Sequence, residues 1–257
     1  SYGWVIGDNT VIAASSTNTD STTLNPVNAG STTVKASATY GGVTVYSAVR
    51  DVHVAGFTLT ESVLNGLTYM GNDTYFVDPT YGGTPYISFS YSFTGINEST
   101  DVTYTSDSSK YTSSDTSIAL FDARNSGQAC QADISAGSGS VTVKATVLLT
   151  ATGEEIVATK TFTILRLVLS IDGTAVNWNV NALGAAGTGH SLSVSLQGAS
   201  GTCSYTWGTS DSSIISLSST TYASTTASCV ASGSSTITVT VHYGGNDYTG
   251  SKMLMVP

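Results

Sequence analysis

The fold class is decided by the stretch Ala231-Ser-Gly-Ser-Ser-Thr-Ile-Thr-Val-Thr-Val-His-Tyr-Gly-Gly245. From Ile237 to Tyr243, every second residue is apolar and the residues between them are Thr or His. This alternation is typical of a β-strand with one buried side, because successive side chains of a strand point to opposite faces. The Gly-Gly pair that follows predicts a tight hairpin turn, since glycine readily adopts the backbone angles that such turns need.

The same pattern recurs twice upstream. Residues 34–40 and 141–147 alternate in the same way, and a Gly-Gly pair again follows the first of these stretches. Each strand is preceded by an aromatic residue with an Asp four positions later: Trp4 and Asp8, Tyr111 and Asp115, Trp207 and Asp211. A glycine follows each aromatic residue at a distance of 26 positions: Gly30, Gly137 and Gly233. The spacing predicts three copies of an antiparallel β-sandwich.

Two segments carry a family resemblance: Tyr205-Thr-Trp-Gly-Thr-Ser-Asp-Ser-Ser-Ile214 and Tyr111-Thr-Ser-Ser-Asp-Thr-Ser-Ile118. With the downstream Ala-Ser-Gly233 or Ala-Gly137-Ser and the alternating strand, they resemble the bacterial immunoglobulin-like group 2 domain. The resemblance implies an immunoglobulin-like sandwich. It also implies a setting among bacterial surface proteins, intimin- and invasin-like adhesins, accessory modules of secreted enzymes and phage virion proteins, although a shared fold does not transfer a function.

The repeat divides the chain into module one (residues 1–56), module two (57–166) and module three (167–257). Trp207 lies 40 residues into module three, whereas Trp4 is the fourth residue of the chain, so we expect module one to lack its N-terminal strands. A fragment of a longer chain, completion by a strand of another subunit and a smaller first domain all account for this. The junctions at 54–57 and 164–168 contain no Gly/Ser-rich or Pro-rich run, which favours a rod of sandwiches over a flexible string.

The composition excludes some partners. The 257 residues include 40 Ser and 41 Thr. There are 8 basic and 17 acidic residues, which gives a net charge of -9. So few cations cannot neutralise a run of phosphates, and we expect no nucleic-acid partner. No apolar run approaches the roughly 20 residues of a membrane-spanning helix. Alternating strands explain the Ser and Thr content, since Thr suits the solvent-facing side of a sheet.

No catalytic motif is present in the sequence. It contains no Gly-x-Ser-x-Gly nucleophile turn and no phosphate-binding Gly-x4-Gly-Lys loop. His53, His190 and His242 are distributed one to each module, and no Cys pair has the spacing of a zinc site. We therefore expect a protein that is not an enzyme and has no resident cofactor.

Three groups of residues are candidates for sites. Asp8, Asp115 and Asp211 recur at one position of the repeat, where a carboxylate either fixes a turn by accepting backbone N–H bonds or contributes to a calcium site. Cys203 and Cys229 form a disulfide if the protein is extracellular, or are two small buried residues. The third group consists of aromatic residues in the longest segment of module two, which either face a ligand such as a glycan or pack in the core: Tyr69, Tyr75 and Tyr81.

These observations favour a non-enzymatic structural or adhesive module of a bacterial surface or secreted protein, located outside the cell or on its surface. Its partner would be a protein or glycan receptor. A first alternative is a phage virion or filament subunit that symmetry-related subunits complete by strand exchange. A second alternative is a carbohydrate-binding accessory module.

Overall fold

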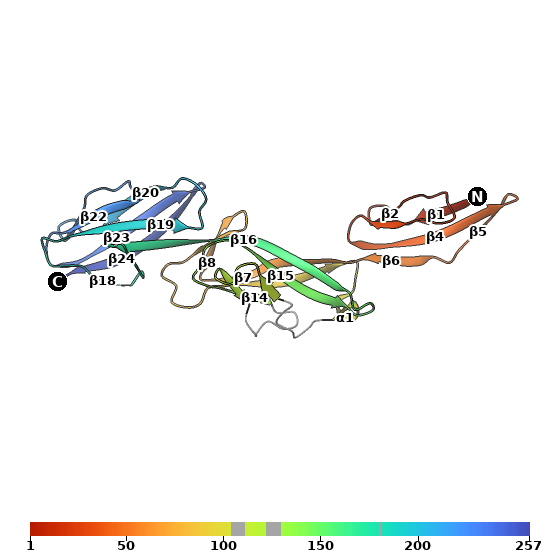
Figure 1. Cartoon of the computed structure of the whole chain (residues 1–257), viewed down its shortest axis with the longest axis horizontal. Coiled ribbons are helices and arrows are strands. Elements are labelled where there is room, and N and C mark those ends of the chain that lie inside the picture. The colour runs from red at the N-terminus through yellow and green to blue at the C-terminus, as the bar shows by residue number, and fades with distance from the viewer. Residues whose placement is uncertain (104–110, 122–129, 180) are drawn as a thin grey trace.

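The computed structural model describes residues 1–103, 111–121, 130–179 and 181–257. These residues form β-strands joined by short turns, with one four-residue helix, and the three modules follow one another along the long axis (Figure 1). The chain is thus an all-β tandem array of immunoglobulin-like sandwiches, as the sequence predicts. Within the described ranges, no helix has the length and hydropathy needed to cross a membrane.

Module one consists of a four-stranded antiparallel sheet, β1-β4-β5 with β6 on β4, and a separate hairpin, β2-β3. Its strands are β1 (Tyr2–Ile6), β2 (Ile12–Ala14), β3 (Leu24–Pro26), β4 (Gly30–Tyr40), β5 (Val43–Tyr46) and β6 (Arg50–Val54).

Module two is a sandwich of two sheets. One sheet has the order β13-β14-β10-β7, and the other is built on β15 and β16. Its core lies between them and includes Ile87, Phe89, Val143 and Phe162. The elements are β7 (Gly56–Asn65), β8 (Leu67–Gly71), β9 (Thr74–Val77), β10 (Tyr86–Thr94), α1 (Glu98–Asp101), β11 (Val102–Thr103), β12 (Tyr111–Ser113), β13 (Ala119–Phe121), β14 (Cys130–Ile134), β15 (Gly139–Leu149) and β16 (Glu155–Ile171).

Module three begins within β16. Its sheets have the orders β16-β19-β22-β21 and β18-β24-β23-β20, and they enclose a core that includes Leu192, Trp207, Val239 and Leu254. The remaining strands are β17 (Thr174–Val176), β18 (Asn181–Ala182), β19 (Gly189–Gln197), β20 (Ser204–Thr209), β21 (Ile215–Leu217), β22 (Ser224–Cys229), β23 (Gly233–Tyr243) and β24 (Asn246–Val256).

Strand register corrects one detail of the predicted repeat. Trp4, Tyr111 and Trp207 lie opposite Ala36, Ala145 and Val239 respectively. Each of these partners is six positions after a glycine at the start of its strand: Gly30, Gly139 and Gly233. The equivalent glycine of module two is therefore Gly139, not Gly137. The shift of two residues leaves every side chain on its predicted face, because the side-chain period of a strand is two.

The second half of module three has the same local structure as module one. The indole N–H of Trp4 donates to the carbonyl of Thr19 at 2.9 Å, and that of Trp207 donates to the carbonyl of Tyr222 at 2.7 Å. Residues 1–56, all of which the structure describes, contain no counterpart of β19, which covers the core of module three. Several apolar side chains of module one are exposed, among them Tyr2, Tyr40, Val43 and Val45.

Candidate functional site at the joint between modules two and three

β16 runs through the joint without a break (Figure 1). Its first half pairs with β15 in module two and its second half with β19 in module three. Phe162 and Ile164 pack into the core of module two, whereas Leu165 and Leu167 pack into that of module three. Because alternate residues of a strand face opposite sides, this change of parity places the two cores on opposite sides of one strand. The expected domain boundary at 166/167 lies inside that strand.

A glycine brings the modules into contact beside β16. Gly198 directly follows β19 at φ +85°, and a Cβ there would overlap the carbonyl oxygen of Ile164 and lie 2.8 Å from the backbone nitrogen of Gly139. The joint between modules one and two has the same arrangement. Gly95 follows β10 at φ +77°, and a Cβ there would overlap the carbonyl oxygen of Val54. A side chain at either position would separate the modules, so both joints require glycine.

The β8–β9 hairpin contributes to the cores of both modules. β9 pairs in parallel with β16 at the joint. Tyr75 packs into the core of module two, and the next residue, Phe76, packs into that of module three. There the ring of Phe76 meets the ring of Tyr248 edge to face, with centroids 5.2 Å apart. Asn246 also donates from Nδ2 to the carbonyl of Met70 at 3.2 Å, so the hairpin holds the two modules together.

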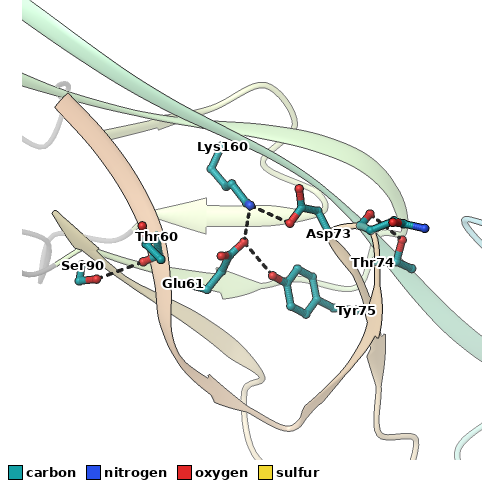
Figure 2. A network of polar contacts seen from close by, with 8 residues as sticks. Thr60, Glu61, Asp73, Thr74, Tyr75, Ser90 and Lys160 are labelled. Atoms are coloured by element: carbon teal, nitrogen blue, oxygen red, sulfur yellow. Dashed lines mark hydrogen bonds and ion pairs between the residues drawn. The ribbon is translucent and has the colours of Figure 1, made fainter. Parts of the chain in front are cut away.

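A polar network ties the hairpin to β7 and β16, as Figure 2 shows. Nζ of Lys160, on β16, lies 2.7 Å from Oδ1 of Asp73 and 2.9 Å from Oε1 of Glu61. The hydroxyl of Tyr75 donates to the same Glu61 oxygen at 2.8 Å. The backbone N–H of Thr163 donates to the carbonyl of Asp73 at 2.8 Å, which fixes the turn of the hairpin against β16.

Burial and charge act against each other in this network. Burial raises the pKa of Glu61, but hydrogen bonds from Lys160 and Tyr75 outweigh it and hold that pKa below its ordinary value. Burial lowers the pKa of Lys160, and the contacts with Asp73 and Glu61 outweigh it and raise that pKa. Burial, followed by the Glu61 carboxylate, raises the pKa of Tyr75. At neutral pH Lys160 is therefore an ammonium beside the Glu61 carboxylate, to which the neutral hydroxyl of Tyr75 also donates.

The three repeated aspartates fix turns of one geometry. In Asp8, Asp115 and Asp211, Oδ1 accepts two hydrogen bonds from the residue two positions later in the chain. One comes from its backbone N–H at 2.8 or 2.9 Å, and the other from its hydroxyl at 2.6 Å. These bonds lower the pKa of each carboxyl, and the hydroxyl bonds have a larger effect than the N–H bonds. Among the described residues, no three His, Cys, Asp or Glu side chains gather as they would around a metal ion. Calcium bound partly by backbone carbonyls stays an untested prediction at these turns.

Cys203 and Cys229, for which the sequence left open a disulfide or two small buried residues, are free thiols in this structure, Cys229 buried and Cys203 half-buried. They lie at opposite ends of module three. Cys203 directly precedes Ser204, which pairs with His242 near the C-terminal end of β23. The residue after Cys229 donates its N–H to the carbonyl of Ile214, and Ile214 packs on Gly233 at the N-terminal end of β23. A disulfide needs Cα atoms within about 7 Å of each other, and the length of β23 separates these two.

The aromatic candidates lie in three different environments. Tyr75 is 2% exposed and faces the core rather than a ligand. Tyr69 is 54% exposed, with its ring centroid 5.4 Å from that of Tyr75. Tyr81 is half-buried against Gly66 and lines a cavity of about 320 Å³ between modules two and three, together with Arg166 and Trp178.

A chain of polar side chains that sequence reasoning missed crosses β20, β23 and β24. Nδ1 of His242 lies 2.6 Å from Oδ1 of Asp247, and Nε2 lies 3.0 Å from Oγ1 of Thr206. Thr240 and Thr249 form a similar exposed pair at 2.9 Å on β23 and β24. We interpret the chain as cross-strand pairing that stabilises an exposed sheet face, because such pairs form wherever polar residues lie opposite each other.

No family model and no curated protein matches the sequence. Among solved structures, the chain is similar to the three N-terminal domains of the bacteriophage RB49 Highly Immunogenic Outer Capsid protein, with 13% identity, a TM-score of 0.37, and coverage of 100% of this chain and 88% of that chain. It is also similar to the D00-D0 domain of intimin, with 13% identity, a TM-score of 0.36, and coverage of 77% of this chain and 99% of that chain. Similarities at this level concern the fold alone.

Proposed function

We propose that this chain is a non-enzymatic structural or adhesive rod segment of a bacterial surface or secreted protein. Its role is mechanical: stacked sandwiches hold a binding surface at a distance from the point of attachment. The observation that carries the proposal is the sharing of β16 and the β8–β9 hairpin by two hydrophobic cores. A joint built in this way restricts the relative motion that separate domains ordinarily have.

The hydrogen-bond ladder beside β16 supports this role. The strand pairs with residues 139–148 on one side of the joint and with residues 192–197 on the other. Tension applied along the rod therefore acts across two ladders that share one backbone. Phe76 adds a buried side chain from module two to the core of module three, so the modules cannot separate without exposing apolar surface.

Small-angle scattering on the 257-residue chain tests the proposal. We expect an elongated particle in which modules two and three keep one fixed relative orientation. A compact particle, or a broad ensemble of orientations about this joint, would contradict it. The measurement is repeated over a range of concentrations, because association through the exposed side chains of module one would raise the apparent length.

The same rod suits a virion or filament subunit. Exposed apolar side chains gather on one part of module one, where Tyr2, Val43 and Val45 line a cavity of about 500 Å³. Exposed apolar surface of this kind favours contact with another polypeptide segment. Regular polymers in electron micrographs would favour the subunit, whereas a monomeric rod at all concentrations would favour the cell-surface protein.

A carbohydrate-binding role is the second candidate, and one observation favours it. The cavity of about 320 Å³ at the joint is lined by the rings of Tyr81 and Trp178 and by the polar side chains of Asp78, Arg166 and Gln197. Aromatic faces with a few polar groups are suited to sugars, and ligand sites often lie between domains. A glycan array tests this role, with Tyr81→Ala expected to abolish any signal and Tyr222→Ala, an exposed tyrosine of module three, as the control.

A further inference from the structure

Lys160, Asp73 and Glu61 bring an amine, a carboxyl group and a second carboxylate into direct contact (Figure 2). Nζ of Lys160 lies 2.7 Å from Oδ1 of Asp73 and 2.9 Å from Oε1 of Glu61. The side chains of Lys160 and Glu61 are only 21% and 20% exposed, and the buried ring of Tyr75 lies beside them. Residues so far apart in the sequence meet here because β7 and β16 converge at the β8–β9 turn.

We propose that Lys160 and Asp73 condense into an intramolecular amide, with Glu61 carrying the protons. Nζ of Lys160 attacks Cγ of Asp73, the Nζ–Cγ bond forms, and one Cγ–O bond breaks. Two of the three ammonium protons pass through Glu61 to the departing oxygen, which leaves as water, and the third stays on the amide nitrogen. The positive and negative charges of the pair disappear together. No oxidant, reductant or further reactant is needed, and Glu61 ends the reaction as the carboxylate it was.

Proximity makes this reaction favourable within the fold. A free amine and a free carboxylate do not condense in water, but groups held in contact reach effective concentrations of about 10⁵ to 10⁸ M. The ammonium of Lys160, which is 21% exposed, also loses part of its hydration in the fold, and the neutral amide would not carry that cost; the Asp73 side chain is 47% exposed. The backbone bond from Thr163 to Asp73 at 2.8 Å, together with the ladder of β16, holds both reacting residues in place.

The surroundings of the two carboxylates decide their roles. Oε1 of Glu61 lies 2.9 Å from Nζ of Lys160, and the hydroxyl of Tyr75 holds that oxygen in place, so Glu61 is positioned to take a proton from the amine and return it. Asp73 projects from the turn at φ +52°, and its carboxylate accepts a hydrogen bond from Lys160 at 2.7 Å. Asp73 is therefore the carboxyl group that the amine attacks.

The cross-link would join the β8–β9 turn covalently to β16, which passes through the joint. Under a tension high enough to break hydrogen bonds, the cross-link would still hold the hairpin against β16. The mechanical value of the cross-link rests on the proposed rod function, but its formation does not. The mass of the chain and its solution shape therefore test the two proposals separately.

Intact-mass measurement of the denatured 257-residue protein is the test. We expect a mass lower than the sequence mass by one water, and a proteolytic digest containing a branched peptide that joins Lys160 to Asp73. Lys160→Arg and Glu61→Gln should both have the full sequence mass. Lys35→Arg is the matched control, because Lys35 lies over the ring of Tyr46 in module one, away from this network, and it should still lose the water.

Three results would overturn the proposal. The first is a wild-type protein with the full sequence mass. The second is loss of water that persists in Lys160→Arg, which would place the dehydration elsewhere, for example at the Asp172-Gly173 sequence. The third is a branched peptide that ends at Glu61 instead of Asp73. Circular dichroism is measured on Glu61→Gln to check that the variant is folded. Tyr75→Phe, which keeps all three reacting groups, must still lose the water.

Discussion

The ring of Phe76, from module two, meets the ring of Tyr248, from module three, edge to face at a centroid distance of 5.2 Å and an interplanar angle of 72°. Phe76 is 8% exposed and Tyr248 is 2% exposed, so the contact lies within a core and not on a surface. A side chain that completes the core of the neighbouring module makes the folding of one depend on the other. The joint is therefore part of the fold of both modules.

Phe76→Ala should destabilise module three although the substitution lies in module two. Removing a buried Phe costs about 3 to 5 kcal/mol, from lost burial and the cavity left behind. We expect a lower unfolding midpoint for module three in calorimetry and a wider range of module orientations in scattering. Phe57→Ala is the control, because Phe57 stacks on Phe93 inside module two. An unchanged joint in Phe76→Ala would show that the hairpin is not its anchor.

Gly198→Ala should be more damaging than Gly173→Ala, although the two glycines have φ values of +85° and +79°. Alanine in this conformation costs about 1 to 2 kcal/mol at either position. At Gly198 the new Cβ would also overlap the carbonyl oxygen of Ile164, whereas at Gly173 nothing lies within 4 Å. Denaturant unfolding measures the difference, and equal losses of stability would contradict a steric role for Gly198.

Tyr75→Phe should lower stability at neutral pH and flatten its decline at alkaline pH. The lost hydrogen bond to an ionised Glu61 corresponds to about 1.5 to 3 kcal/mol. The folded-state pKa of Tyr75 is raised above 10.0. Its contribution is therefore complete below pH 10 and is lost as the pH rises through the folded-state pKa. Urea unfolding between pH 7 and pH 11 measures this, with the exposed Tyr69→Phe as the control. Equal alkaline slopes in wild type and Tyr75→Phe would contradict the prediction.

Asp211→Ala should destabilise module three at neutral pH and reduce its sensitivity to acid. Hydrogen bonds from Ser213 hold the folded-state pKa of Asp211 below 3.8, so the stability they confer is complete above that pH and is lost as the pH falls below it. Thermal melts from pH 7 down to pH 2 measure the effect, with the exposed Asp51→Ala as the control. In the same melts, a calcium-dependent rise that Asp211→Ala abolishes would support the calcium alternative at these turns.

Most of the fold could be predicted because its signal is local. The alternation at Val141, Val143 and Ala145 reports a strand with one buried side, whatever lies on the other side of the core. The repeated aspartate turns were equally predictable, since the hydrogen bonds of Asp211 reach only two residues along the chain. Gly139 was misplaced by two positions because a fixed spacing cannot detect a short insertion.

The joint could not be predicted in the same way. Residues 164–168 look like a short apolar linker in the sequence, but the structure places them inside one continuous strand. The one available signal was the change of buried parity between Ile164 and Leu165, and its meaning depends on which cores lie on the two sides. Tyr75 and Phe76 illustrate the same limit, since adjacent aromatic residues do not reveal that each belongs to a different core.

The sequence alone determined the all-β class, the threefold repeat and the faces of the long strands, because these follow from periods of two residues and from turns within a few residues. Tertiary structure alone decided that Lys160 meets Asp73 and Glu61, that Cys203 and Cys229 lie apart, and that two modules share β16. These contacts join residues distant along the chain. They depend on how strands pair and on which face each core occupies, and local sequence patterns do not encode that information.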